Sequence, residues 1–315
     1  MSLFLVTGGG GFIGSNLVEM ILCKGDAVRV LDNFATGRRA NLESGAAWAK
    51  AGGGSFELQE GDIRDLATCR RALAGVDYVL HQAAIPSVQR SVKDPISSND
   101  VNVSGTLNLL VAARDEKVKR FVMASSSSLY GESETLPKVE SMPSAPISPY
   151  GLQKLAGETY CGLFHRLYGL PAIALRYFNV FGPRQDPTSE YSAVIPLFIN
   201  AIKNGAQPTI FGDGQQTRDF SYIANVVQAN LRSCEAGPAA HGGAFNIACG
   251  ERISLNDLVS ILGEFAGRRV EPAYAPHRAG DIKHSLAGIE KAQQFLGYVP
   301  EVSVRDGLRR TWDVQ

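Results

Sequence analysis

Tyr150 and Lys154 form the pair in this sequence with the clearest potential for chemistry, because they lie four residues apart. On a helix this spacing places both side chains on one face. A lysine ammonium beside a phenol favours the phenolate, so we expect Lys154 to lower the pKa of Tyr150 from its usual value of about 10. Such a tyrosine can remove or return a hydroxyl proton near neutral pH. The same spacing also occurs on ordinary surface helices, so its weight depends on the neighbouring motifs.

A run of four serines, residues 125–128, lies shortly before this pair and directly after an apolar segment. Serine hydroxyls at the carboxyl end of a strand can both donate to and accept from a substrate oxygen. Ser148 and Pro149 come just before Tyr150 and are typical of a helix start. The alternative for the serine run is that its hydroxyls only cap the end of the strand.

A glycine-rich motif near the N-terminus indicates a phosphate site. Gly8, Gly11 and Gly14 are spaced GxxGxxG between an apolar segment, 3–6, and a predicted helix, 12–24. Glycine permits a tight turn and lets backbone N–H groups approach a pyrophosphate, while the helix N-terminus adds partial positive charge. The context of strand, glycine turn and helix therefore predicts a bound dinucleotide.

Asp32 favours NAD as that dinucleotide, because it ends the second predicted strand. A carboxylate there can accept hydrogen bonds from both ribose hydroxyls and would repel a 2′-phosphate. Arg38 and Arg39 follow closely and leave NADP as the alternative.

Two further strand ends are expected to contribute to this site. Asp62 follows the third strand, where it could contact the adenine amino group or cap the next helix. Gln82, Ala83 and Ala84 end the fourth strand, and the small alanines would let a flat cofactor lie close. We expect His81, just before them, to be a structural histidine with satisfied ring nitrogens.

Short apolar runs alternate with amphipathic segments over the first 180 residues, which predicts a parallel, doubly wound α/β (Rossmann) sheet. The predicted strands are 3–6, 27–31, 56–59, 76–80, 120–124, 172–178 and 244–247, and the predicted helices are 12–24, 66–73, 96–114, 150–168, 194–202, 223–231, 255–265 and 287–296. We expect residues 1–179 to form an NAD-binding domain, with a return to it at about 221–248. Residues 180–315 are expected to form a smaller, mixed α/β substrate lobe.

Composition excludes several classes of protein. The 315 residues carry 31 basic and 31 acidic side chains, so the net charge is zero, which argues against a nucleic-acid-binding surface. No apolar run is long enough to cross a membrane. The five cysteines are far apart, which predicts reduced thiols in a cytoplasmic protein and no metal site.

With these motifs in place, the chain resembles the extended short-chain dehydrogenase/reductase family over nearly its whole length. Segments 125–131, 176–185 and 278–281 are similar to the motifs of its nucleotide-sugar 4-epimerase branch. Segments 136–140 and 185–195 resemble the UDP-N-acetylglucosamine 4-epimerases in particular, next to the UDP-glucose 4-epimerases.

This resemblance implies NAD-dependent 4-epimerisation of UDP-glucose and UDP-galactose, and of their N-acetylated counterparts. The 4-hydroxyl would be oxidised to a ketone, the keto sugar would turn over, and the hydride would return to the other face. Tyr150 would be the acid/base, Lys154 its tuner and Ser126 the relay to the sugar O4. The other substrate contacts implied are Ser87, Ser127, Ser128, Asn179, Arg218, Arg278, Asp281 and Ser285.

Within that set, Asn179 would contact the diphosphate, and Arg218 and Arg278 would clamp it. Asp281 would accept from a sugar or ribose hydroxyl. The expected cofactor contacts are Gly8, Gly11, Phe12, Ile13, Gly14, Asp32, Asn33, Asp62, Ile63, Gln82, Ala83, Ala84, Asn102, Tyr150, Lys154 and Tyr177. Asn102 would act through a bound water, or would simply be a polar helix residue.

Ser285 is implied to lie beside the 2-substituent of the sugar, where a serine leaves room for an N-acetyl group. Two alternatives remain: a UDP-glucuronate 4-epimerase or decarboxylase of the same family, and a non-catalytic NAD-binding regulator. A dehydratase is disfavoured, because the serine run offers no Asp-Glu pair. The family also implies a homodimer formed through the helices at 96–114 and 150–168.

Overall fold

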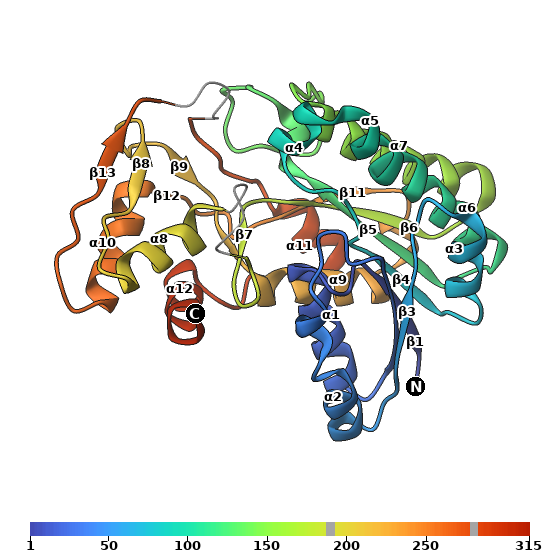
Figure 1. Cartoon of the computed structure of the whole chain (residues 1–315). Coiled ribbons are helices and arrows are strands. Elements are labelled where there is room, and N and C mark those ends of the chain that lie inside the picture. The colour runs from blue at the N-terminus through green and yellow to red at the C-terminus, as the bar shows by residue number, and fades with distance from the viewer. Residues whose placement is uncertain (187–192, 278–282) are drawn as a thin grey trace.

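A parallel sheet of seven strands, in the order β11-β6-β5-β4-β1-β2-β3, forms the centre of the larger part of the molecule (Figure 1). The structure is a computed structural model, and it describes residues 1–186, 193–277 and 283–315. The strands are β1 (Leu3–Thr7), β2 (Ala27–Asp32), β3 (Phe56–Glu60), β4 (Tyr78–His81), β5 (Arg120–Ser126), β6 (Ala172–Tyr177) and β11 (Ala244–Ile247). The doubly wound α/β fold is therefore confirmed.

The strand order reverses between β1 and β4, which are neighbours in the sheet. From β1 the chain proceeds outward through β2 and β3, and from β4 it proceeds the other way through β5 and β6. In open sheets of this kind the crevice for a ligand lies at the carboxyl ends of the strands flanking the reversal. Thr7 and His81 are register partners at that point.

Helices cover both faces of the sheet (Figure 1), and each face has its own cluster of buried apolar residues. Leu17 of α1 and Val226 of α9 belong to one cluster, and Leu73 of α3 and Leu109 of α6 to the other. The helices of this part are α1 (Phe12–Cys23), α2 (Gly45–Gly52), α3 (Leu66–Leu73), α4 (Val88–Lys93), α5 (Pro95–Asn99), α6 (Thr106–Asp115), α7 (Pro149–Tyr168), α9 (Ile223–Glu235) and α11 (Glu290–Leu296).

The predicted helix over 96–114 forms without a break, but its middle is π-helical and not α-helical. Between α5 and α6 the backbone is π-helical over Asp100–Gly105, called η2. Short π-helical turns of this kind are frequent at functional sites. The helix expected over 287–296 begins later, at Glu290.

The return to the main sheet that the sequence indicated lies where α9 and β11 form, since β11 pairs with β6. The remaining elements build the smaller lobe from helices of 10 or 11 residues and from very short strands. They are β7 (Val180–Phe181), α8 (Val194–Lys203), β8 (Thr209–Phe211), β9 (Thr217–Arg218), β10 (Ser221–Tyr222), β12 (Ile253–Ser254), α10 (Leu255–Phe265), β13 (Ala273–Ala275) and α12 (Val304–Val314). Helix α12 was not predicted.

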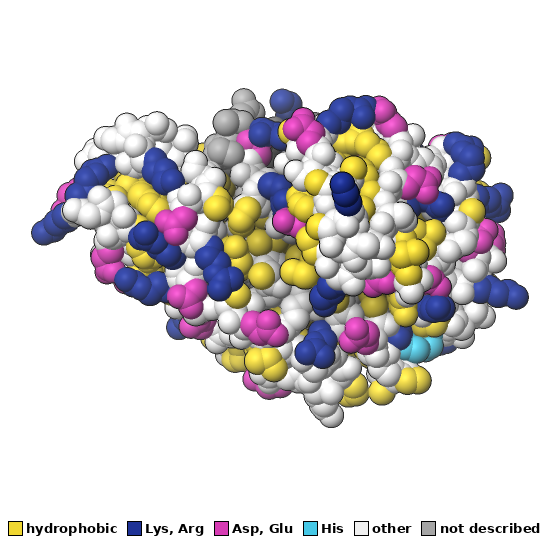
Figure 2. All heavy atoms as spheres, turned by 90° about the horizontal axis from the view of Figure 1, so that it is seen from below, with side chains coloured by type: hydrophobic (Ala, Val, Ile, Leu, Met, Phe, Trp, Pro, Cys, Tyr) yellow, Lys and Arg dark blue, Asp and Glu magenta, His cyan; other side chains and the backbone are white. Residues whose placement is uncertain are grey.

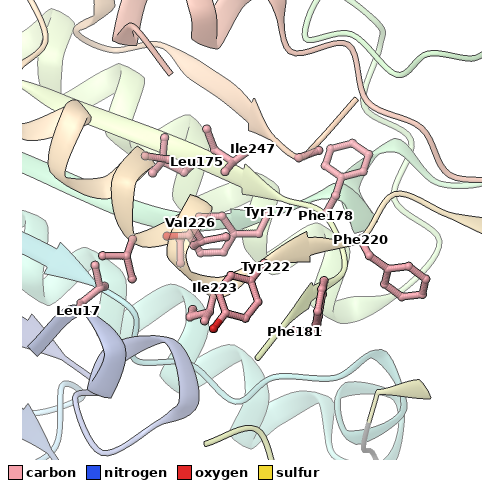
Figure 3. Close-up of a cluster of buried hydrophobic side chains, with 14 of the residues drawn as sticks. Leu17, Leu175, Tyr177, Phe178, Phe181, Phe220, Tyr222, Ile223, Val226 and Ile247 are labelled. Atoms are coloured by element: carbon pink, nitrogen blue, oxygen red, sulfur yellow. The ribbon is translucent and has the colours of Figure 1, made fainter. Parts of the chain in front are cut away.

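The apolar core of the sheet continues into the smaller lobe. The cluster that contains Leu17 and Leu175 also contains Ile199 of α8 and Leu258 of α10. Figure 3 shows the join, where Phe178, Phe181 and Phe220 follow the side chains on β6 toward the lobe. The rings of Phe181 and Phe220 meet edge to face, with centroids 6.2 Å apart. This shared core fixes the lobe against the sheet.

Seen from below, basic and acidic side chains are interspersed over the surface (Figure 2). This view agrees with the equal numbers of acidic and basic residues. Among the residues that the structure describes, no helix is long and apolar enough to cross a membrane.

Candidate active site

The glycine turn after β1 has a geometry that larger residues could not adopt. Gly8 has a φ of +68°, and a Cβ there would lie 2.7 Å from the backbone nitrogen of Ala83. A Cβ on Gly14 would lie 2.2 Å from the carbonyl oxygen of Gly8. No side chain caps the N-terminus of α1 at Gly11, and its first turn has no acidic residue. An uncapped helix N-terminus of this kind can bind a phosphate, and the phosphate site stays a prediction.

Asp32 lies at the end of β2 beside this turn. Its Oδ2 accepts a hydrogen bond from Gly10 N at 2.8 Å, and its Oδ1 accepts one from Phe34 N at 2.7 Å. Each carboxylate oxygen retains a second lone pair for a ribose hydroxyl. Arg38 is paired with Asp186 at 2.6 Å and Arg39 with Glu60, so both cations that could favour a 2′-phosphate already face carboxylates.

Asp62 does not cap the next helix, which corrects one of its two predicted roles. The cap of α3 is Asp65, whose carboxylate accepts from Ala67 N and Thr68 N, because Asp65 directly precedes the first turn. Asp62 instead accepts from Asn33 Nδ2 at 2.8 Å and pairs with Arg64. The Arg64 guanidinium lowers the pKa of Asp62 to about 2.

A cavity of about 510 Å³ extends from Asp32 to Tyr150 along the carboxyl ends of the strands. We call it the cofactor cavity. Its lining includes every predicted cofactor contact except Asn102, and it also includes the predicted substrate residue Ser87: Gly8, Gly11, Phe12, Ile13, Gly14, Asp32, Asn33, Asp62, Ile63, Gln82, Ala83, Ala84, Ser87, Tyr150, Lys154 and Tyr177.

Asn102 lies behind the cofactor cavity, in the π-helical turn η2, and is only 2% exposed. Its Oδ1 accepts from Ile85 N at 2.8 Å, and its Nδ2 donates to Ile85 O at 3.0 Å and to Gln153 Oε1 at 2.8 Å. The amide thus holds the backbone of Ile85, a cavity-lining residue, in place of lining the cavity itself.

Tyr150 and Lys154 occupy the first turns of α7, whose start is set by Pro149 and by the Ser148 hydroxyl, which accepts from Gly151 N. Lys154 Nζ donates to the carbonyl oxygen of Ala124 at 2.8 Å and lies 5.8 Å from the centre of the Tyr150 ring. The Tyr150 hydroxyl shares a hydrogen bond with Ser126. A phenol, an ammonium and a serine hydroxyl therefore meet at one end of the cofactor cavity.

The expected lowering of the Tyr150 pKa is wrong for this structure. Burial raises the pKa of the phenol, and the hydrogen bond from Ser126 offsets only part of that rise. Burial also lowers the pKa of Lys154 to about 8. The spacing of the two residues indicated their proximity, but the cost of burying charge acts on both groups.

The four serines have different surroundings. Ser125 lines the cavity, but its Oγ donates to Glu158 Oε2 at 3.0 Å. Ser126 ends β5 and donates to Ser128 Oγ at 2.9 Å. Ser127 and Ser128 belong to the 3₁₀ turn that follows.

His81 is the structural histidine that we expected. Its Nδ1 is 2.8 Å from Thr7 Oγ1 and its Nε2 is 2.9 Å from Thr106 Oγ1. Burial lowers the pKa of His81 to about 3, so the ring is neutral at pH 7.

A second cavity of about 440 Å³ lies in the smaller lobe between β7, α8, β8 and β9, and we call it the lobe cavity. Asn179 and Arg218 both line it, and Ala193 lines both cavities. Arg218 Nη1 donates to Thr217 O at 2.9 Å and to Lys283 O at 3.2 Å, which holds the guanidinium at the wall. Ser285 N donates to Thr217 O at 3.0 Å, so Ser285 lies beside β9. Arg278 and Asp281 lie outside the described residues.

The lining also contains charged and polar residues that the sequence analysis did not assign as contacts, among them Arg90 on α4, and Arg184, Gln185 and Asp186 after β7. Arg184 pairs with Glu19 of α1 at 2.6 Å and lies over the ring of Trp48. The segment 176–185 resembles a family motif, but nothing in its sequence indicates that its end contacts helix α1.

The sequence and the structure were compared with known proteins. The profile of the family described as "NAD dependent epimerase/dehydratase family" matches residues 4–248. A protein described as a putative UDP-glucose 4-epimerase of Methanocaldococcus jannaschii is 39% identical over 98% of this chain and 96% of its own length.

Two solved structures are also similar over almost the whole chain. A UDP-N-acetylglucosamine 4-epimerase from Methanobrevibacter ruminantium, in complex with UDP-N-acetylmuramic acid, has a TM-score of 0.92 and 38% identity, covering 99% of this chain and 97% of that one. A UDP-glucose 4-epimerase from Thermotoga maritima, with UDP-glucose, has a TM-score of 0.91 and 36% identity, covering 100% and 98%.

Proposed function

Because this chain belongs to the NAD dependent epimerase/dehydratase family, we propose that it is an NAD-dependent isomerase that interconverts UDP-hexoses at C4. The observation that carries the proposal is the meeting of Tyr150, Ser126 and Lys154 at the end of a cavity that begins at the glycine turn. The 4-epimerase relatives and structures support the same reaction.

The residues of the cofactor cavity fit NAD. Gly8 and Gly14 leave no room for a Cβ, and the uncapped N-terminus of α1 would hold the diphosphate. Asp32 would accept from the adenosine ribose. When bound, NAD⁺ supplies the acceptor of the C4 hydride and later its donor.

Tyr150 moves the proton. Its phenol oxygen would take the proton of the sugar 4-hydroxyl and later return it, with Ser126 bonded to the same phenol and placed to pass it on. Burial raises the pKa of Tyr150, so the phenolate requires a positive neighbour. Lys154 is that neighbour in its protonated form, and its pKa of about 8 leaves it mainly protonated at pH 7.

Arg218 and Asn179 would hold the nucleotide in the lobe cavity. A guanidinium binds a diphosphate through several parallel N–H groups, which suits Arg218 to this role. The sugar would then lie where the two cavities meet, near Ala193. With UDP anchored in the lobe, the 4-keto sugar can turn to present its other face to the same catalytic groups.

The test is to incubate the purified protein separately with UDP-glucose, UDP-N-acetylglucosamine and UDP-glucuronate and to separate the C4 epimers by chromatography. We expect UDP-galactose and UDP-N-acetylgalactosamine as products, with no net reduction of NAD. The absence of a C4 epimer with all three sugars would contradict the proposal. UDP-glucuronate is included because Arg90 lines the cofactor cavity, and a hexuronate needs a cation near its carboxylate.

We propose that Ser285 sets the breadth of the sugar specificity. A serine beside the 2-substituent leaves space for an N-acetyl group, so Ser285→Tyr should reduce kcat/KM for UDP-N-acetylglucosamine by about 10-fold or more and spare UDP-glucose. The ratio of the two kcat/KM values checks this. An equal loss for both sugars would argue against a selective role.

The proposal also covers the oligomeric state and the location in the cell. We infer that two copies associate through α5 and α7, where Ile96 and Leu152 are exposed apolar side chains. A cytoplasmic location fits the cysteines, all five of which are free thiols.

A further inference from the structure

Three side chains on one face of α7 contact three consecutive residues at the end of β5. Tyr150, Lys154 and Glu158 are spaced four apart, so they share this face. Each contacts a different one of three consecutive residues: Lys154 Nζ donates to Ala124 O, Glu158 accepts from Ser125 Oγ, and Tyr150 shares a hydrogen bond with Ser126. Two of the three α7 residues are the proposed catalytic pair, and the third, Glu158, has no role in the mechanism above.

Glu158 is a largely enclosed carboxylate held by a buried guanidinium. Its Oε2 accepts from Arg176 Nε at 3.0 Å and its Oε1 accepts from Arg176 Nη2 at 2.5 Å. The side chains of Arg176 and Glu158 are only 6% and 11% exposed. A two-point pair of this kind has a defined geometry, because both groups are planar.

Arg176 is fixed in turn by the sheet. Arg176 lies on β6, where it is the register partner of Ser125 on the neighbouring strand β5. Its Nη1 donates to Tyr130 Oη at 2.7 Å, and its guanidinium lies 5.0 Å from the centre of the Tyr130 ring. All three guanidinium nitrogens therefore have acceptors, and Glu158 has little freedom to move.

We propose that Glu158, clamped by Arg176, is a positioning residue for the epimerisation: it fixes Ser125 and thereby sets the distance between Ser126 and Tyr150. This inference rests on the proposed function. Ser125 and Ser126 are neighbours on β5, so a shift of one moves the other relative to α7. Proton transfer is steep in distance, and a displacement of about 1 Å can cost on the order of 100-fold in rate.

The informative variant is Glu158→Gln. It keeps the shape and one oxygen, but it turns the other oxygen into an NH₂ group that faces the guanidinium and breaks the two-point pair. We expect kcat to fall by about 10- to 100-fold, while KM for UDP-glucose changes by less than about 3-fold, because the lobe cavity is untouched. NAD affinity, followed by quenching of protein fluorescence, should stay as in the wild type.

Two controls separate positioning from simple loss of structure. Glu57→Gln breaks the Arg29–Glu57 pair between β2 and β3, at 2.8 Å, and should leave kcat unchanged. Where Glu158→Gln alone folds poorly, the double variant Glu158→Gln with Arg176→Gln removes both buried charges and avoids leaving one unpaired. Circular dichroism melts provide the folded fraction used to normalise kcat.

The outcomes are distinct. A normalised kcat equal to that of the wild type, in either folded variant, overturns the positioning role, and so does a loss seen only in KM. If the wild type epimerises none of the UDP-sugars, the proposed function itself has failed and this inference fails with it. Wild-type activity with a fall in kcat at constant KM and constant NAD affinity is the supporting result.

Discussion

The cofactor cavity and the lobe cavity are built in opposite ways. The first lies along the carboxyl ends of adjacent strands of one sheet, so its walls come from short motifs that follow β1, β2 and β4. The second is walled by one face of α8, by two- and three-residue strands and by loops brought together from distant parts of the chain. The comparison teaches that regular backbone can place one site, whereas the other needs specific polar contacts to hold its walls.

Asp219 is the clearest such contact. It is fully buried, and its carboxylate accepts from Cys249 N at 3.0 Å, from Gly250 N at 3.2 Å and from Ala287 N at 3.2 Å. It thus joins the residue after Arg218 to two other segments of the smaller lobe. Burial raises the pKa of Asp219 to about 7, even though three N–H groups face it.

If the cofactor cavity carries the chemistry, removing its acid/base should have the largest effect. Tyr150→Phe keeps the ring and deletes the hydroxyl, so we expect kcat to fall by about 100- to 10,000-fold. NAD and UDP should still bind, as isothermal titration calorimetry can show. Full activity in this variant would end the assignment of Tyr150.

If the lobe cavity serves binding alone, its variants should change KM and spare kcat. Arg218→Lys keeps the charge but loses the planar fork, and we expect KM for UDP-glucose to rise by about 10-fold with kcat within about 3-fold. Initial-rate kinetics with both parameters fitted will measure the split. A matching fall in kcat would mean that the two cavities are not separate in role.

The smallest expected effect concerns Asp219 and pH. Burial raises the pKa of Asp219 from its usual 3.8 to about 7 in the folded chain, so between these pH values the native state binds a proton that the unfolded chain does not. Its contribution to the free energy of unfolding therefore falls as pH rises from about 4 to about 7 and is constant above. Asp219→Asn should remove this pH dependence. The difference in the free energy of unfolding between wild type and variant should therefore change by about 1 kcal/mol or more between pH 4 and pH 7.

Urea unfolding at pH 5, 6, 7 and 8 checks the difference between Asp219→Asn and the wild type. His81 titrates in part of the same range with the opposite sign, because burial lowers its pKa from 6.5 to about 3. That contribution is common to both proteins and cancels in the difference. A difference that does not change with pH would show that Asp219 carries no titration between 5 and 8.

Much of the fold and of the cofactor cavity could be predicted, because the signals are local. Gly8, Gly14 and Asp32 lie within a single strand–turn–helix–strand unit. Tyr150 and Lys154 lie within one helix. Such features depend on neighbours in the chain, so their types and spacing indicate their geometry.

What could not be predicted depends on contacts between distant segments. Spacing alone gives no measure of burial, so the direction of the Tyr150 pKa shift was wrong. The hydrogen bonds of Glu158 and Asp219 join strands and loops far apart in the chain and leave no periodic trace. Helix α12 contains Gly307, which lowers the local helix propensity. A Cβ at this position would lie 2.7 Å from Tyr222, so close packing against Tyr222 requires the glycine and the sequence alone does not predict the helix.

The pairing of β11 with β6 has a consequence for rebuilding this molecule. A chain cut after Phe178 would leave β6 paired with β5 on one side only, and its exposed edge would invite association with other chains. The smaller lobe is therefore not a detachable module at the end of the sequence. An exchange of lobes between relatives would have to transplant separate stretches of the chain and leave α9, β11 and α11 with the sheet that they complete.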